Sequence, residues 1–347
     1  MGPWGTYIMK ISVIGSGSWG IAATKMLSEN GHDLTLWSFD EKEAAMLQTE
    51  RMNPALLPGV QLPEKVRVTT DIACAEGADI VVVAVPSFAV FETARKMSPY
   101  MKKQVVVLLS KGFDKNSGYS LLSDLLERVF MGAVPVVALT GPSHAEEVGR
   151  GVPTAVVAAS VNKAAAELVQ EAFMNPVFRV YTTPDIVGAE LGGAMKNIMA
   201  LAVGISDGAG YGDNTKAMLM TRGITEMARF GVAMGGRPET FTGLSGIGDL
   251  IVTCISQHSR NRRAGLLIGS GISPDEAIKQ VGATVEGYFA AQAVHELTRG
   301  KDIELPICQA VYELLYEGVS LEDTERALMT RGKKHEIEES WMKHINW

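Results

Sequence analysis

The chain has 347 residues with 46% hydrophobic and 20% charged side chains, a globular composition in a length that favours two domains. Its formal net charge of −7 argues against nucleic acid as a partner, because nucleic-acid binders carry a basic surplus. The most hydrophobic long window, residues 189–205, contains Glu190, Lys196 and Asn197, so it predicts a buried helix and no membrane span.

The first elements form one βαβ unit. Residues 1–8 are expected to be an extension without signal-peptide character, before a core that begins near Met9. The apolar run 11–14 predicts a strand, residues 21–29 a helix, and residues 34–37 a second strand. A glycine-rich turn of the GxGxxG pattern, residues 15–20, joins the first strand to the helix. This strand–turn–helix context predicts a dinucleotide-binding site.

Each glycine of the motif has its own expected task. Gly15 permits a tight turn, Gly17 lets the backbone approach a pyrophosphate, and Gly20 lets the helix pack closely on the strand. The helix start then offers free N–H groups and the positive end of its dipole to phosphates.

Further apolar runs predict strands at 80–85, 105–109 and 136–139, with helices at 91–97 and 121–129 between them. This alternation predicts a mostly parallel sheet covered by helices on both faces. Ligands of such sheets bind beyond the carboxyl ends of the strands. That edge is expected to hold Ser18, Trp19, Pro86, Phe88, Lys111 and Ser143.

From about residue 186 the strand pattern gives way to helical periodicity. We expect helices at 189–205, 217–234, 261–269, 274–280, 288–300 and 305–317. The predicted fold is therefore α/β, with a Rossmann-type dinucleotide-binding domain over residues 1–188 followed by an all-α domain over residues 189–347. The cleft between the domains is the expected site.

Two charged residues stand in apolar surroundings. Lys196 lies within the apolar helix, where burial would lower its pKa and make it a proton donor and acceptor near neutrality; the alternative is a lysine that reaches the surface. Asp249 follows a glycine-rich loop, and either pairs with a cation such as Lys196 or caps a helix.

A basic cluster, residues 258–263, opens the helix at 261–269. Ser259 is expected to cap that helix, and Arg260 with the free N–H groups to hold a phosphate; the alternative is a solvated run of charges. Lys111 adds a cation at the cofactor edge. Glu286 is expected to accept a hydrogen bond from a ribose or amide, or else to be an exposed helix acid.

The cysteines Cys74, Cys254 and Cys308 are scattered and form no CxxC pair. This spacing indicates neither a zinc site nor a disulfide framework, and no metal is expected. A reducing compartment, the cytoplasm, fits best.

Taken together, the ordered motifs resemble the bacterial type of NAD(P)-dependent glycerol-3-phosphate dehydrogenase over residues 9–331. They are the glycine motif 15–20, Ser-Lys-Gly at 110–112, Gly-Pro-Ser-His-Ala at 141–145, residues 190–197, 243–249 and 259–261, and Val-Glu-Gly at 285–287. The resemblance implies an oxidoreductase that reduces dihydroxyacetone phosphate reversibly to sn-glycerol 3-phosphate for phospholipid synthesis, with NAD or NADP as cofactor.

The resemblance also implies roles for individual residues. Lys196 is the implied catalytic acid and base. The residues implied to surround the substrate are Lys111, Gly141, Ser143, Lys196, Asp249, Ser259, Arg260 and Asn261. Those implied to contact the cofactor, besides Gly15, Gly17 and Gly20, are Ser18, Trp19, Lys111, Ala145, Arg260, Thr284 and Glu286.

The sequence departs from the family pattern where the adenosine ribose of the cofactor would bind. Ser38, Phe39 and Asp40 stand after Trp37, where the family often has a histidine or arginine. Asp40 has the spacing of a ribose-binding acid, or it caps the next helix. We therefore predict that NADH serves at least as well as NADPH.

Other interpretations remain at this point. A related β-hydroxyacid dehydrogenase would need no cluster at 259–263, and a dinucleotide sensor would need neither Lys196 nor Asp249. The expected partner is a small phosphorylated substrate, and a homodimer is left open.

Overall fold

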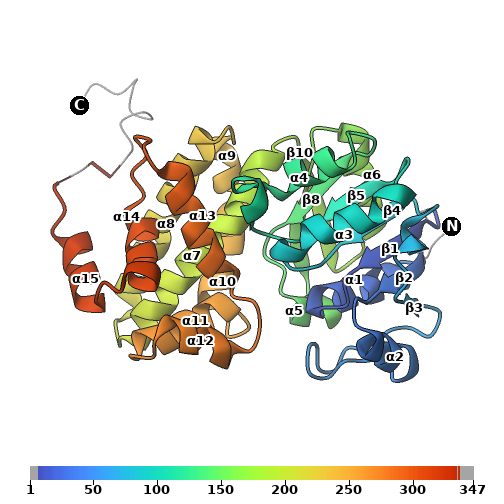
Figure 1. Ribbon diagram of the computed structural model, residues 1–347, viewed down its shortest axis with the longest axis horizontal. Helices are drawn as coiled ribbons and strands as arrows, with labels where there is room; N and C mark the ends of the chain where they lie inside the picture. Colours follow the sequence, from blue (N-terminus) through green and yellow to red (C-terminus); the bar gives the residue numbers. More distant parts are fainter. Residues whose placement is uncertain (1–6, 334, 337–347) are drawn as a thin grey trace.

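The structure is a computed structural model that describes residues 7–333, 335 and 336, and its two halves differ in class. A sheet flanked by helices forms the N-terminal half, and helices alone form most of the C-terminal half (Figure 1). This arrangement confirms the predicted α/β fold class. Residues 7 and 8 of the predicted extension are exposed and lack regular structure, while residues 1–6 lie outside the described part.

The main sheet has eight strands in the order β10-β9-β8-β5-β4-β1-β2-β3. Neighbours are parallel except for β8 and β9, which are antiparallel. The strands are β1 (Lys10–Ile14), β2 (Asp33–Trp37), β3 (Arg67–Thr69), β4 (Ile80–Val83), β5 (Val105–Leu108), β8 (Val136–Thr140), β9 (Thr154–Ala159) and β10 (Phe178–Thr183). The central strands are buried on both faces, which explains their continuous apolar runs.

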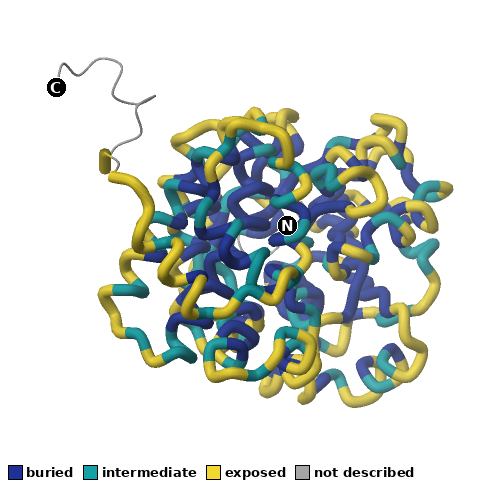
Figure 2. Tube along the Cα trace, turned by 60° about the vertical axis from the view of Figure 1, so that its left-hand side comes forward, coloured by how far each residue is buried: buried dark blue, intermediate teal, exposed yellow. Residues whose placement is uncertain are grey.

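Successive side chains of each strand enter opposite layers, so the sheet separates two cores. Val82 and Val107 belong to the core beneath α1 (Ser18–Glu29) and α6 (Lys163–Phe173). Val83 and Val106 belong to the core beneath α3 (Val90–Met97) and α4 (Leu122–Val129). Figure 2 shows that the buried residues lie mainly inside the molecule and the exposed ones along its outside.

Strands β9 and β10 were not predicted. β10 is the edge strand, and its side chains alternate between buried Phe178 and Val180 and exposed Arg179 and Tyr181. Such an alternating edge strand lacks the continuous apolar pattern that marks the central strands in the sequence.

Short elements complete the N-terminal half. They are α2 (Glu41–Thr49), α5 (Ala145–Gly149), and an antiparallel pair of β6 (Phe113–Asp114) and β7 (Ser120–Leu121). The pair stands between β5 and α4, and therefore shapes the loop that carries Lys111.

The second half is built around one central helix, α7 (Ile186–Gly208), which packs against α8, α10, α11 and α13. The other helices are α8 (Asp213–Ala233), α9 (Pro238–Phe241), α10 (Asp249–Ile255), α11 (Arg260–Gly269), α12 (Pro274–Val281), α13 (Glu286–Thr298), α14 (Pro306–Tyr312) and α15 (Leu321–Met329). α7 is long and apolar enough to cross a membrane, but its most apolar window is 89% buried inside the protein. The prediction of a buried helix is thus confirmed.

Glycines bring α7 and α11 into backbone contact. A Cβ on Gly204 would lie 2.2 Å from the carbonyl oxygen of Arg262, and one on Gly265 would lie 2.3 Å from that of Leu201. Only glycine fits at such an approach. The contact fixes the start of α11, which carries Arg260, beside the helix that carries Lys196.

Candidate active site

The glycine turn between β1 and α1 has the geometry of an anion cradle. Gly15 has φ +120°, and a Cβ on Gly20 would lie 1.8 Å from the carbonyl oxygen of Gly15. A Cβ on Gly17 would meet no atom within 4 Å, so this side of the turn is open. Gly17 caps α1 without a side-chain bond, which leaves the first N–H groups of the helix available to a phosphate. These residues fit a dinucleotide's pyrophosphate.

Neighbouring turns meet at the same edge of the sheet. The Trp19 indole N–H donates to the carbonyl oxygen of Ser143 at 2.8 Å, and the Ser18 hydroxyl donates to that of Leu56 at 2.7 Å. Gly141, Ser143 and Ala145 follow β8, and Ala145 begins α5. The turn after β1 and the turn after β8 are therefore held together.

At the end of β2, Asp40 caps α2: its Oδ1 accepts from the Glu43 N–H at 2.8 Å. The capping alternative is thus the observed one. A carboxylate that the sequence analysis missed lies by the glycine turn instead. Glu43 Oε2 accepts from the hydroxyls of Ser16 at 2.5 Å and Ser38 at 3.0 Å. Glu43 lies in the first turn of α2, three residues after Asp40, and this spacing could have indicated it from the sequence.

Lys196 and Asp249 lie side by side, as the pairing alternative predicted. Lys196 Nζ is 2.5 Å from Asp249 Oδ1, and Lys111 Nζ is 2.6 Å from Asp249 Oδ2. Lys196 also donates to the Thr253 hydroxyl at 2.8 Å. Lys196 is 7% exposed and Asp249 is 1% exposed, so Lys196 does not reach the surface. One buried carboxylate thus holds two ammonium groups from the two halves of the chain.

Burial sets the protonation of this cluster. Loss of solvent lowers the pKa of Lys196 to about 7, although the Asp249 carboxylate opposes that shift. Burial acts to raise the pKa of Asp249, but the charges of Lys111 and Lys196 outweigh it and leave the pKa below its usual range. Asp249 is therefore a fixed anion, and Lys196 can exchange a proton near neutral pH.

Two further groups beside Lys196 were missed from the sequence. Thr253 follows Asp249 by one helical turn on α10, so both side chains face α7. Helical spacing from Asp249 would have found it. His144 is half-buried, and burial followed by the charge of Lys196 lowers the pKa of its ring. From the sequence a surface or capping role is expected for it; His144 stands at the N-cap position of α5, but its side chain makes no capping hydrogen bond.

The start of α11 faces the same region. Ser259 caps the helix by accepting from the Arg262 N–H at 3.2 Å, as predicted, and Arg260 is the exposed first residue. The Asn261 amide donates to Asn197 at 2.9 Å and accepts from the Gly287 N–H at 2.8 Å. Its side chain thus ties the start of α13 to the residue after Lys196.

Thr284 and Glu286 lie at the start of α13. Glu286 is half-buried and accepts from the Ser87 hydroxyl at 2.7 Å and the Ser87 N–H at 3.2 Å. Burial raises its pKa, while Ser87 and the nearby Arg260 act in the opposite direction. Glu286 is therefore not a free surface acid but bridges α13 to the turn after β4.

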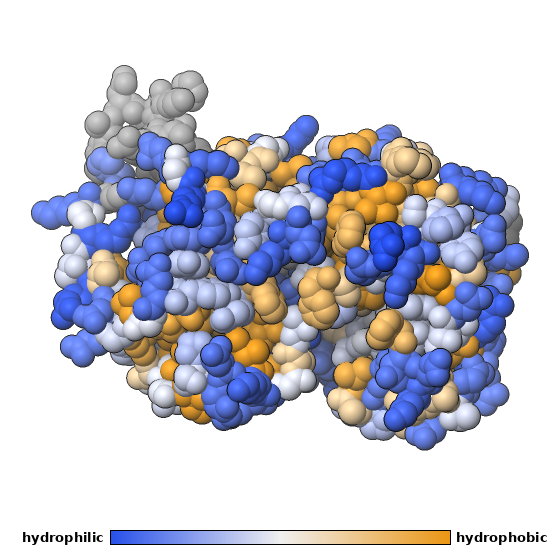
Figure 3. All heavy atoms as spheres, viewed as in Figure 1, coloured by the Kyte–Doolittle hydropathy of each residue, from blue (hydrophilic) through white to orange (hydrophobic). Residues whose placement is uncertain are grey.

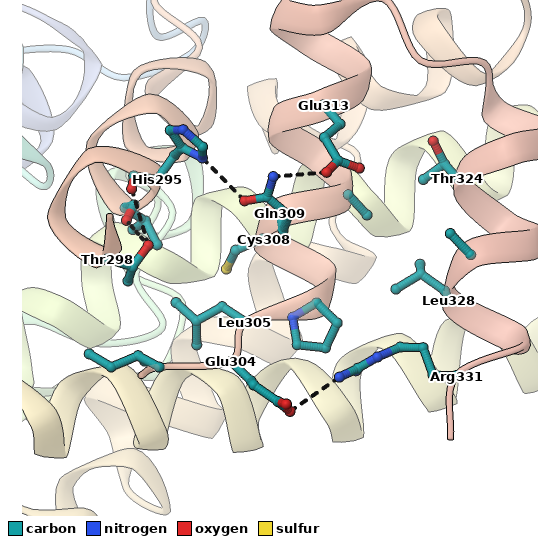
Figure 4. A pocket seen from close by; sticks show the side chains of 15 residues that line it. His295, Thr298, Glu304, Leu305, Cys308, Gln309, Glu313, Thr324, Leu328 and Arg331 are labelled. Atoms are coloured by element: carbon teal, nitrogen blue, oxygen red, sulfur yellow. Dashed lines mark hydrogen bonds and ion pairs between the residues drawn. The ribbon is translucent and has the colours of Figure 1, made fainter. Parts of the chain in front are cut away.

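The cleft between the halves is visible in Figure 3 as a notch on the side where α11 faces α5 and α2 in Figure 1. A cavity of about 430 Å³ lies elsewhere, among α13, α14 and α15 (Figure 4). There His295, Gln309 and Glu313 form a hydrogen-bonded chain. None of the predicted site residues lines this cavity, so it is separate from the Lys196 cluster.

Comparison with known proteins places this geometry in a family. The model of the NAD-dependent glycerol-3-phosphate dehydrogenase N-terminus matches residues 10–166, and that of the C-terminus matches residues 185–326. The chain is 49% identical over 337 residues to a glycerol-3-phosphate dehydrogenase [NAD(P)+] of Fusobacterium nucleatum, covering 96% of this chain and 100% of the relative. The Bacillus subtilis enzyme of that name is 45% identical, with coverage of 95% and 96%.

Solved structures agree. A crystal structure of glycerol-3-phosphate dehydrogenase from Coxiella burnetii has a TM-score of 0.89 and 37% identity, and covers 93% of this chain and 99% of that one. The yeast enzyme has a TM-score of 0.80 and 25% identity, with coverage of 92% and 99%. With both family models and close relatives matched along nearly the whole chain, this protein belongs to the NAD-dependent glycerol-3-phosphate dehydrogenase family.

Proposed function

We propose that this chain reduces dihydroxyacetone phosphate reversibly to sn-glycerol 3-phosphate with NADH or NADPH. The observation that carries the proposal is the buried cluster of Lys196, Asp249 and Lys111 at the cofactor edge of a dinucleotide-binding sheet. Membership of the glycerol-3-phosphate dehydrogenase family supports it. The product would supply phospholipid synthesis.

A dinucleotide held by the glycine turn would supply hydride chemistry at the substrate's C2. Lys196, as the ammonium, gives a proton to the carbonyl oxygen during reduction, and as the amine takes it back during oxidation. Asp249 holds the Lys196 chain in place and favours its charged form. Lys111 brings a second cation to the same carboxylate and can hold the substrate's oxygen atoms. Gly141, Ser143 and Asn261 complete the proposed walls around the substrate.

The proposed cofactor contacts follow the edge of the sheet. The glycine turn and the open start of α1 would hold the pyrophosphate, with Ser18 and Trp19 at the first turn of that helix. Ala145, Thr284 and Glu286 would line the rest of the path, on α5 and at the start of α13. Arg260 would lie between cofactor and substrate.

Measured oxidation of NADH and NADPH with dihydroxyacetone phosphate, with simple 2-keto acids as controls, tests the proposal. We expect turnover with the phosphorylated ketone and little with the acids. Preference for a 2-keto acid would contradict it, and would favour a hydroxyacid dehydrogenase on the same fold.

Arg260 is proposed to bind the substrate phosphate, with Ser259 and the start of α11. Arg260→Ala should raise the KM for dihydroxyacetone phosphate about ten- to a hundredfold, because a hydrogen bond to a charged group contributes about 1.5–3 kcal/mol. Steady-state kinetics with varied substrate measure this. Arg263→Ala, which removes an exposed charge of the same helix, is the matched control and should change KM little. An unchanged KM in Arg260→Ala would show a merely solvated cluster.

Glu43 is proposed to set the cofactor preference, since its carboxylate contacts the glycine turn where the adenosine ribose would lie. NADH should serve at least as well as NADPH, because the carboxylate would repel a 2′-phosphate. Glu43→Gln should raise the NADPH-to-NADH ratio of kcat/KM about tenfold, or about 1.4 kcal/mol. Glu41→Gln, on the same first turn of α2, is the control. A tenfold NADPH preference in the unsubstituted enzyme would refute this role.

We also propose that the chain divides near residue 188 and acts in the cytoplasm. β10, the last strand of the described residues, ends at Thr183 and α7 begins at Ile186, which supports the division. Limited proteolysis and cell fractionation would test these points, and light scattering would decide between a monomer and a homodimer.

A further inference from the structure

Glu190 is a buried carboxylate whose hydrogen bonds join the two halves of the chain. It lies on α7 and is 7% exposed. Glu190 Oε1 accepts from the Ser123 N–H at 3.1 Å, and Oε2 accepts from the Ser123 hydroxyl. Burial raises the pKa of Glu190 to about 7, while the bonds from Ser123 act against the shift. Keeping an acid here costs folding free energy, so its partners must offset that cost.

The partner of Glu190 is the start of a helix. Ser123 is the second residue of α4, and the residue before that helix, Leu121, provides no side-chain cap. The first N–H groups of a helix have no partner within it, and its positive dipole end favours a carboxylate. Glu190 therefore caps α4 from the other half of the chain, 67 residues away.

Glu286 makes the same kind of contact on a second turn. It accepts from the N–H and hydroxyl of Ser87, which begins the helical segment that leads into α3. In both places a glutamate of the helical half binds a serine at the start of a helical segment of the sheet half: Ser87 after β4, and Ser123 after the short strand β7. The two contacts tie the turn after β4 to α13 and the start of α4 to α7, and in sequence they stand on either side of the Lys111 loop.

A small cavity links Glu190 to the reactive cluster. About 10 Å³ in volume, it is lined by Glu190, Lys111 and Thr140, among others, which leaves room for about one water molecule. The Thr140 hydroxyl is buried and has no hydrogen-bond partner among the described atoms. From this cavity Lys111 reaches Asp249 and donates a hydrogen bond to it, and Asp249 in turn accepts one from Lys196. A shift of α7 against α4 would thus disturb both lysines.

We propose that Glu190 is a positioning residue that, by capping α4, aligns the Lys196 helix with the dinucleotide-binding half. The inference rests on the proposed function, because its effect is read in that reaction. Lys196 lies on the helical half and the glycine turn that would hold the cofactor lies on the sheet half. Hydride transfer therefore depends on how the two halves are positioned relative to each other. A displacement of about 1 Å can cost about a hundredfold in rate.

Glu190→Ala tests the role. It should lower kcat with dihydroxyacetone phosphate at least about tenfold, while the Kd for NADH, measured by fluorescence, changes less than about twofold. The Kd should change little because the glycine turn, which would hold the pyrophosphate, belongs wholly to the sheet half, whereas the helical half would add only the contacts of Arg260, Thr284 and Glu286. Glu190→Gln should keep kcat within about threefold, since its amide oxygen still accepts from the Ser123 N–H. Ser123→Ala should add little to Glu190→Ala, because the two side chains act together.

Asp185→Asn is the matched control, since Asp185 is also buried and caps α7 itself. Its carboxylate accepts from Gly188, Arg237 and Thr240, all within the helical half. It should lower the unfolding temperature but leave kcat near normal. A normal kcat in Glu190→Ala, or an equal loss in Glu190→Gln, would overturn the positioning role. Failure of the unsubstituted enzyme to reduce dihydroxyacetone phosphate would instead refute the proposed function.

Discussion

Replacing Lys196 with alanine is expected to lower kcat for the reduction of dihydroxyacetone phosphate at least about a hundredfold, the usual scale of general acid catalysis. The side chain is the buried cation nearest to the fixed Asp249 carboxylate, and its pKa of about 7 suits proton exchange. The Kd for NADH should barely change, because the glycine turn lies on the other half of the chain. Single-turnover kinetics and cofactor fluorescence separate the two effects.

Two comparisons make this test specific. Lys216→Ala removes another lysine paired with an aspartate, 3.0 Å from Asp207, and should keep nearly normal turnover. A small primary amine added to Lys196→Ala should restore part of the rate, because the truncated side chain leaves space for a soluble proton donor. Turnover within about threefold of normal in Lys196→Ala would remove this residue from the chemistry.

The cofactor half of the site could be predicted from sequence because its signals are local. The glycine turn needs three glycines at set intervals after a strand, and the central strands are apolar without interruption because both faces are buried. These features depend on neighbours within one βαβ unit. Such local patterns can be recognised in a single sequence without any knowledge of distant contacts.

The missed parts depend on long-range contacts. Glu43 reads as an ordinary acid in the first turn of a helix, and only the fold brings it to Ser16. Glu190 appears in the sequence as a charge within an apolar window and as the start of the motif 190–197, but its partner Ser123 lies 67 residues away. Asp249 and Lys196 are 53 residues apart, yet each stood out, because a charge amid apolar neighbours demands a partner. A charged residue among apolar neighbours can thus be predicted to have a partner, but the sequence does not always show which residue the partner is.

Asp249→Asn should change the pH dependence in a direction that the cluster determines. The carboxylate raises the pKa of Lys196, whereas Lys111 lowers it, so removal of the negative charge must bring that pKa below about 7. Reduction needs the ammonium form, so its rate falls as pH rises through this pKa. The falling limb should therefore move to lower pH, and oxidation, which needs the amine, should begin at lower pH.

The size of the effect follows from the distance between the charges. An opposite charge within about 4–6 Å shifts a pKa by about 1–3 units, so at pH 8 the rate of reduction should fall at least about tenfold, with partial recovery at pH 6. Lys111→Met should move the same limb to higher pH, because it removes a repelling cation. Profiles of kcat against pH for both variants, with circular dichroism to check folding, decide the matter. A limb that moves the same way in both, or in neither, would mean that Asp249 does not control the proton of Lys196.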